Sequence, residues 1–147
     1  MPNPFVHVEL NTDDVAKAKQ FYKNVFAWKL EDMPMGPGMT YTMLDAGKGV
    51  GGGMQVKPMA QAPTQWLPYV EVADVKATLA KAAAHGAQVV APYMEIGEMG
   101  AIGVFVDPTG AGLGVWQVAK KPARKPAKKK PAKKAAKKAT RKAGKRR

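Results

Sequence analysis

The chain repeats a short strand pattern once, and this repeat constrains its fold more than any other feature of the sequence. Residues 7–10 (HVEL) match residues 69–72 (YVEV), 62 positions later. In each copy an apolar pattern with helical spacing follows, and then three strand-like segments. A period of this length is too long for a solenoid. The repeat therefore predicts two β-α-β-β-β modules, at about residues 3–57 and 65–119, related by a pseudo-twofold axis.

Local signals place the elements of the first module. Residues 5–10 alternate between two faces as a strand does, and Thr12 or Asp13 is a suitable N-cap for the helix that follows. Apolar side chains then recur on one helical stripe as far as Phe26. The remaining strands are expected at residues 28–33, 39–44 and 50–56, with a linker at 57–64.

The second module repeats this order. A strand is expected at residues 66–72, and an alanine-rich helix at 75–85 is ended by Gly86. Further strands are expected at 88–92, 101–106 and 112–118. The Asp-Pro-Thr-Gly sequence at 107–110 has the chemistry of a type I turn between the last two strands.

Three segments carry a resemblance to a known family: HVELNTDDVAKAKQFYKNVFAW, WLPYVEVADV and DPTGAGLGVWQ. They resemble the vicinal oxygen chelate superfamily, which contains glyoxalases, bleomycin resistance proteins and dioxygenases, and especially its glyoxalase-like branch. The resemblance covers about residues 3–119. It implies an α+β fold in which both modules form one cupped mixed sheet, and it implies a homodimer. It leaves the activity open, because one fold hosts many functions.

The same resemblance bears on a metal cofactor. Metal-using members hold a divalent ion, such as Ni, Zn, Fe or Mn, with one side chain from the first and the last strand of each module. By that resemblance His7 is the surviving metal candidate, because Tyr69, Gly53 and Gly114 occupy the other three positions. A single imidazole does not retain a divalent ion against water. We therefore expect no cofactor, with a divalent metal only if the chain is an enzyme of the family.

His7, Glu9 and Glu71 are the candidate catalytic residues. His7 and Glu9 share one face of the first strand, and Glu71 is the repeat mate of Glu9. If that face lines a pocket, the two carboxylates meet near the pseudo-axis and raise each other's pKa, which makes one of them a general acid or base. The alternative is a hydrogen-bonded strand histidine with two carboxylates at a wet cavity mouth.

Aromatic and methionine side chains are the candidate ligand-binding residues, namely Tyr41, Met54, Trp66, Tyr69 and Trp116. Further methionines lie in equivalent loops of the two modules, Met33, Met35 and Met39 in the first, and Met94 and Met99 in the second. Flexible thioethers at a cavity mouth suit varied apolar ligands, whereas the alternative is that they fill gaps in the core.

Charge divides the chain in two. Of 24 basic and 11 acidic residues, residues 120–147 hold 16 Lys or Arg and no acid, so residues 1–119 carry 8 basic and 11 acidic side chains. The basic segment has no apolar residue larger than proline, which predicts a disordered tail. It resembles linker-histone tails and predicts nucleic acid or another polyanion as the partner. The candidate contacts are Lys120, Lys121, Arg124, Lys125, Lys128, Lys129, Lys130, Lys133, Lys134, Lys137, Lys138, Arg141, Lys142, Lys145, Arg146 and Arg147.

Composition excludes some classes of function. The chain has no cysteine, which rules out disulfides, thiolate metal sites and a cysteine nucleophile. Without a signal peptide or a long apolar run, we expect a cytoplasmic location, with the nucleoid as a more specific site, and no membrane partner.

Three functions remain open. The leading one is a glyoxalase-like protein that binds a small ligand, has a degenerate metal site and contacts nucleic acid through its tail. The second is a metal-dependent lyase, isomerase or dioxygenase of the same superfamily. The third is a bleomycin-type protein that sequesters a drug.

Overall fold

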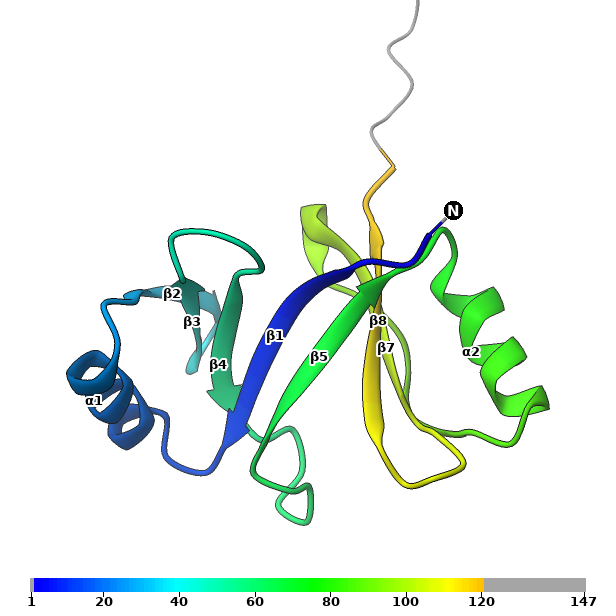
Figure 1. Cartoon of the computed structure of the whole chain (residues 1–147), viewed down its shortest axis with the longest axis horizontal. Coiled ribbons are helices and arrows are strands. Elements are labelled where there is room, and N and C mark those ends of the chain that lie inside the picture. The colour runs from blue at the N-terminus through cyan, green and yellow to red at the C-terminus, as the bar shows by residue number, and fades with distance from the viewer. Residues whose placement is uncertain (1, 121–147) are drawn as a thin grey trace, which may run out of the picture.

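One eight-stranded mixed sheet is the framework of the protein, in a computed structural model that describes residues 2–120. The strand order is β2-β3-β4-β1-β5-β8-β7-β6 (Figure 1). The central strands β1 (Phe5–Thr12) and β5 (Gln65–Glu71) pair antiparallel, whereas the pairs β1–β4 and β5–β8 are parallel. This symmetrical order is the one expected from a duplication, and the predicted α+β fold is confirmed.

Both modules have the same succession of elements. The first continues with α1 (Val15–Val25), β2 (Lys29–Gly36), β3 (Met39–Asp45) and β4 (Gly52–Val56). The second continues with α2 (Val75–Ala84), β6 (Gln88–Glu95), a short 3₁₀ helix η1 (Gly97–Met99), β7 (Gly100–Val106) and β8 (Gly112–Val118). No helix within residues 2–120 is long and apolar enough to cross a membrane.

Three local expectations were wrong. The side chain of Asp14, rather than that of Thr12 or Asp13, caps α1 by accepting a hydrogen bond of 2.9 Å from the Lys17 amide. β6 continues past Pro92, its expected end, to Glu95, and β2 likewise continues past Met33, its expected end, to Gly36. β6 is an edge strand, where a missing N–H is tolerated, and its register with β7 shifts beside Pro92.

The helices stand at opposite ends of the molecule (Figure 1) and cover the same face of the sheet. α2 is tightly packed, since Val75 and Leu79 are buried in one cluster with Val72 and Val115. α1 contributes no fully buried residue, and its apolar side chains lie against a second cluster formed by Leu10, Leu44 and Met54. The first module is therefore the more open of the two.

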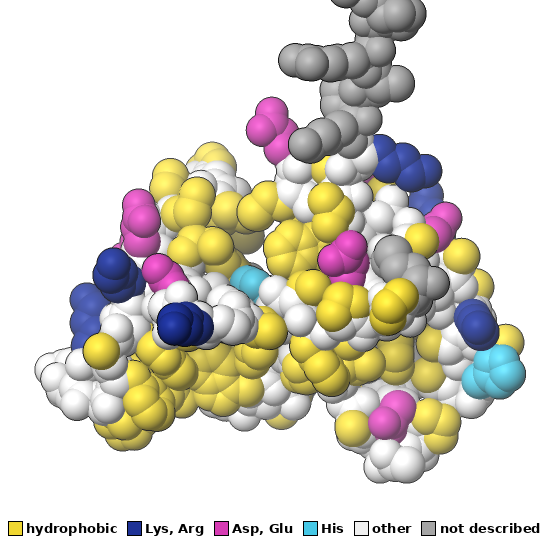
Figure 2. Space-filling view, turned by 45° about the horizontal axis from the view of Figure 1, so that its top comes forward, with side chains coloured by type: hydrophobic (Ala, Val, Ile, Leu, Met, Phe, Trp, Pro, Cys, Tyr) yellow, Lys and Arg dark blue, Asp and Glu magenta, His cyan; other side chains and the backbone are white. Residues whose placement is uncertain are grey.

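Within residues 2–120, neither α1 nor α2 lies on the other face of the sheet, which we call the cup. Strand alternation decides which side chains reach it: the register partners Leu10 and Trp66 face the helices, and the register partners His7 and Tyr69 face the cup. Figure 2 shows a hollow between the two halves of the molecule, with a histidine side chain in it.

Candidate functional site

Glu9 is the centre of a hydrogen-bonded network in the cup. Its side chain is buried, with 7% of its surface exposed. Oε2 accepts a hydrogen bond of 3.0 Å from the Tyr41 hydroxyl, while Oε1 accepts one of 3.2 Å from the Tyr69 hydroxyl and one of 3.0 Å from Gln55 Nε2. The two salt bridges found within residues 2–120 lie elsewhere. A buried carboxylate is thus held by neutral donors from three other strands.

Tyr41 joins this carboxylate to His7. The distance from His7 Nε2 to the Tyr41 hydroxyl is 2.7 Å. Because the phenol has one proton and donates it to Glu9, His7 Nε2 must be the donor to the phenol oxygen. In the neutral imidazole, Nδ1 is then the acceptor. His7, Tyr41 and Glu9 therefore form a directional chain along which a proton can move.

Burial sets the charge state of each member. Burial raises the pKa of Glu9, and the hydrogen bonds from Tyr41 and Tyr69 oppose that rise. Burial lowers the pKa of His7, so that its imidazole is neutral at pH 7. Burial, together with the negative charge of Glu9, raises the pKa of Tyr41 and of Tyr69. Both phenols consequently remain protonated hydrogen-bond donors.

Two glycines make room for the tyrosine rings. A Cβ atom on Gly53 would overlap the ring and hydroxyl of Tyr41, and a Cβ atom on Gly114 would overlap the ring of Tyr69. Both glycines have ordinary strand backbone, so what they provide is space rather than a left-handed conformation. Each tyrosine therefore fills the volume that a side chain of the neighbouring last strand would need.

The strand register corrects the alignment of these glycines. Gly114 lies opposite Tyr69, whereas Gly53 lies opposite Glu9. The repeat mate of Glu9 is Glu71, and Glu71 lies opposite Trp116. The structural counterpart of Gly53 is thus Trp116, and the expected equivalence of Gly53 and Gly114 was wrong by two residues.

Glu71 is not part of the network. His7 and Tyr69 are partners in the antiparallel pair, so Glu9 lies two residues to one side of this pair and Glu71 two residues to the other. Four strand residues separate them, which is about 13 Å. The expectation that the two carboxylates meet near the pseudo-axis was wrong, because antiparallel pairing sends repeat mates in opposite directions. The cause of the raised Glu9 pKa is burial.

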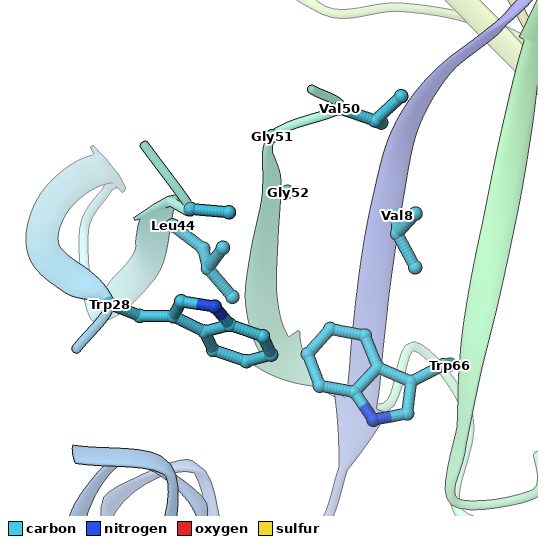
Figure 3. Close-up of a pocket in the computed structure, with 8 residues that line it drawn as sticks. Val8, Trp28, Leu44, Val50, Gly51, Gly52 and Trp66 are labelled. Carbon is cyan, nitrogen blue, oxygen red and sulfur yellow. The ribbon is translucent and has the colours of Figure 1, made fainter. Parts of the chain in front are cut away.

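Two of the expected ligand-binding residues face away from the cup. Met54 is fully buried under α1, and Trp66 donates a hydrogen bond of 3.0 Å from Nε1 to the Tyr22 hydroxyl. Trp66 and Trp28 line a separate apolar cavity of about 200 Å³ on the helix side, which Figure 3 shows together with Val8 and Leu44. Met54 therefore lines neither hollow, whereas Trp66 lines the cavity on the helix side rather than the cup.

The other aromatic candidates do lie in the cup. The rings of Tyr41, Tyr69 and Trp116 have their centroids 6.3, 5.8 and 5.5 Å from that of His7. Trp116 Nε1 donates a hydrogen bond of 2.9 Å to the Met99 carbonyl, which holds the indole in place. Its register partner on β7 is Ile102. One half of the cup therefore holds the network around Glu9, and the other half holds the indole of Trp116, whose register partner on β5 is Glu71.

Gln55 and Asn11 are site residues that the sequence analysis missed. Gln55 Nε2 lies 3.0 Å from Glu9 Oε1 and 3.0 Å from Asn11 Oδ1. The signal was available, because Asn11 follows His7 and Glu9 with strand period two. Gln55 could have been found only from the pairing of β1 with β4, which brings it opposite Asn11.

The side chains of the cup do not form a set of ligands that fits a divalent metal ion. Catalytic sites for such ions use three protein ligands as a rule. Across residues 2–120, the His, Asp and Glu side chains form no group of three or more that could hold one. His7 Nε2 and both oxygens of Glu9 are already engaged within the network.

The sequence of the chain matches a known protein family. A family model described as "Glyoxalase/Bleomycin resistance protein/Dioxygenase superfamily" matches residues 5–115. A Mycobacterium bovis protein named "Putative glyoxylase CFP32" is 38% identical over 114 residues, which cover 75% of this chain and 44% of that protein. A Mycobacterium tuberculosis protein of the same name matches equally. The chain thus spans less than half the length of these relatives.

Solved structures agree with this fold. Methylmalonyl-CoA epimerase from Mycobacterium tuberculosis superposes with a TM-score of 0.57 at 14% identity, covering 79% of this chain and 88% of that one. A hypothetical protein from Bacillus halodurans gives 0.62 at 12% identity, covering 83% and 99%. At these identities the likeness concerns the fold alone. Together with the family model, it shows that the chain belongs to the glyoxalase/bleomycin resistance protein/dioxygenase superfamily.

Proposed function

We propose that this chain binds a small amphipathic organic ligand in its cup and does so without a divalent metal ion. The observation that carries the proposal is the hydrogen bonding of Glu9. Both of its carboxylate oxygens already accept hydrogen bonds, from Tyr41, Tyr69 and Gln55. A metal ion would have to displace them, and removing donors from a buried carboxylate is costly.

The division of the cup indicates the chemistry of the ligand. A polar group of the ligand meets the Nδ1 acceptor of His7, and an apolar group packs against the indole of Trp116, whose ring stands at 86° to the imidazole. Pockets of this kind combine apolar walls with a few polar groups that fix orientation. A drug-sequestering protein likewise binds its ligand without converting it to a product.

A metal analysis of the full-length protein tests the first half of the proposal. The protein is prepared after growth in metal-supplemented medium and freed of nucleic acid by nuclease and high salt, since bound nucleic acid carries ions. We expect well below one divalent ion per chain, both in the wild type and in His7→Ala. One ion per chain in the wild type, lost in His7→Ala, would contradict the proposal and support the function as a metal-dependent enzyme instead.

Two probes test the second half. Bleomycin represents the sequestering function, and the hemithioacetal of glutathione and methylglyoxal represents the lyase function. We expect saturable binding that quenches Trp116 fluorescence, with no product formed. A Trp116→Phe variant identifies the signal, because Trp28 and Trp66 lie on the other side of the sheet. Catalytic turnover of the hemithioacetal would contradict the proposal.

We also propose that the basic segment binds nucleic acid. Its support is the charge pattern of 16 Lys or Arg without an acid in residues 120–147. Lysine contacts phosphates as a point charge and does not read bases, so binding is expected to be independent of sequence. Apart from Lys120, these residues lie outside the part of the chain that the structure describes, and the proposal rests on sequence alone.

A further inference from the structure

Three exposed methionines stand together on the hairpin formed by β2 and β3. Met33, Met35 and Met39 occur within the sequence MPMGPGM. They expose 44%, 43% and 64% of their surface, whereas the core methionine Met54 exposes none. Large apolar side chains left this open contribute little to the stability of the hairpin.

The hairpin register puts the three side chains on one face. Met33 is the direct partner of Tyr41, and Met39 precedes Tyr41 by two residues, so both share its face. The register shifts between Pro34 and Gly36, so that Gly36 lies opposite Met39 and Met35 is the extra residue between them. Met35 follows Met33 by two residues, and alternation along β2 puts both on the same face of the hairpin. Met33 and Met39 are diagonal neighbours across the strand pair, and such neighbours lie about 7–8 Å apart, within reach of long side chains.

The turn that joins the strands is well defined. Gly36 and Gly38 adopt φ values of 131° and 70°, which favour glycine over other residues. The arrangement of the three methionines is thus built into the hairpin rather than left to a loose loop. Glu31, two residues before Met33, lies on the same face and adds a negative charge beside it.

We propose that Met33, Met35 and Met39 form a binding site for a soft monovalent cation of the copper(I) class. Thioether sulfur is a soft, neutral donor, and such donors select copper(I) over the hard divalent ions. Three thioethers supply the coordination without the imidazoles and carboxylates that divalent ions prefer. The site shares no donor atom with the network around Glu9, although Met33 is the register partner of Tyr41, and the proposal stands whether or not the cup binds an organic ligand.

Silver(I) is the probe for the first experiment, because it shares the preference of copper(I) for thioethers and needs no reductant. Silver nitrate is titrated into the full-length protein carrying ¹³C-labelled methionine methyl groups. We expect about one silver ion per chain, with the methyl signals of Met33, Met35 and Met39 shifting together. Met54, which is buried, and Met59, which is exposed elsewhere, are expected to stay in place.

Leucine variants separate metal binding from apolar contact. In the combined variant Met33→Leu, Met35→Leu and Met39→Leu, size and apolar character are kept while the sulfur is lost. Silver affinity is expected to fall by more than about tenfold, whereas the matched control Met59→Leu retains it. An unchanged urea midpoint verifies that both variants are folded, as expected for exposed positions.

Two results would overturn the proposal. One is silver affinity that survives in the triple leucine variant. The other is a titration in which the histidines respond while the three methyl groups do not. Competition for copper(I) against bathocuproine disulfonate in ascorbate then extends the test to copper itself, and failure of the protein to compete with dilute chelator would refute a copper(I) site.

Discussion

The ring of Tyr69 lies against the backbone of Gly114, its partner in the parallel pair of β5 and β8. This contact lets the Tyr69 hydroxyl reach Glu9 at 3.2 Å. On the other side of the carboxylate, Gly53 makes the same room for Tyr41. The two glycines thus determine which side chains fill this part of the cup. The phenol groups of Tyr41 and Tyr69 point toward Glu9 and occupy the space that side chains on β4 and β8 would need.

Substitution of Gly114 by alanine is expected to destabilise the fold. The new methyl group overlaps the Tyr69 ring, and overpacking of this kind costs about 1–3 kcal/mol of unfolding free energy. Urea unfolding measures the loss. In Gly112→Ala the new Cβ meets the end of the Leu67 side chain at 3.3 Å, so the cost should be smaller.

A double-mutant cycle verifies the cause. If the overlap is responsible, Gly114→Ala costs much less in a Tyr69→Ala background than in the wild type. Additive costs in the two backgrounds would show that Tyr69 is not what the new methyl group meets.

Glu9 should make stability depend on pH. Burial raises the pKa of Glu9 in the folded chain, so the folded state holds more protons than the unfolded state between the ordinary glutamate pKa, about 4.3, and the raised one. The contribution of Glu9 is therefore most favourable below that ordinary value and declines as pH rises through the window. Groups facing Glu9 are Tyr41, Tyr69 and Gln55, with His7 behind Tyr41.

The test compares the wild type with Glu9→Gln by urea unfolding between pH 4.5 and about pH 7.5. We expect the wild type to lose stability relative to Glu9→Gln as pH rises, because glutamine does not ionise. Glu31→Gln, an exposed carboxylate on β2, is the matched control and should follow the wild type. Parallel curves for wild type and Glu9→Gln would mean that Glu9 does not titrate differently on folding.

Removing the Tyr41 hydroxyl should raise the pKa of Glu9 further. The hydrogen bond from Tyr41 is foremost among the side-chain contacts that lower the pKa of this carboxyl group, and phenylalanine cannot make it. The substitution also leaves His7 Nε2 without its partner, so the unfolding free energy should fall by about 1–3 kcal/mol.

Carbon-13 NMR of labelled glutamate carboxyls follows the Glu9 titration directly in Tyr41→Phe. Tyr93→Phe serves as the control, because its hydroxyl bonds the exposed Glu95 rather than the network. An unchanged or lowered Glu9 pKa in Tyr41→Phe would show that the hydroxyl does not stabilise the carboxylate.

The framework of this protein was readable from sequence because its signals are local and repeated. The match of residues 7–10 with 69–72 and the spacing of apolar residues required no knowledge of pairing. The site was less readable, because it depends on register. Glu71 was expected beside Glu9 since the repeat makes them equivalent, yet antiparallel pairing of β1 and β5 separates them.

For the candidate ligand-binding residues, the sequence did not reveal which face of its strand each side chain occupies. Alternation along β4 and β5 turns Met54 and Trp66 toward α1, so Met54 is buried and Trp66 lines the cavity on the helix side rather than the cup. Gln55 joins the network only because β4 pairs with β1 in a particular register. Long-range pairing, which a single sequence does not encode locally, therefore accounts for what was missed.

The two helices should differ in how much their apolar residues stabilise the fold. Leu79 of α2 is 6% exposed, and Leu79→Ala is expected to cost about 2–5 kcal/mol through the cavity it leaves. Phe21 of α1 is 57% exposed, so Phe21→Ala should change the unfolding free energy by less than about 0.5 kcal/mol. Urea unfolding at several protein concentrations measures both. A large cost for Phe21→Ala that shrinks on dilution would instead mean that a second copy of the chain covers α1.

Binding to DNA should be electrostatic and should reside in the basic segment. With about six to ten lysines on phosphates, affinity for duplex DNA is expected to fall by about 10³–10⁵ between 50 and 200 mM salt. A chain ending at Lys120 retains the described sheet and should not bind, since residues 1–119 carry 11 acidic and 8 basic side chains. A variant with the residues after Lys120 in shuffled order should bind as well as the wild type, because charge rather than order makes the contacts. Fluorescence anisotropy with a labelled duplex measures all three proteins. Salt-independent binding, or binding that persists in the shortened chain, would place the contact on the folded domain.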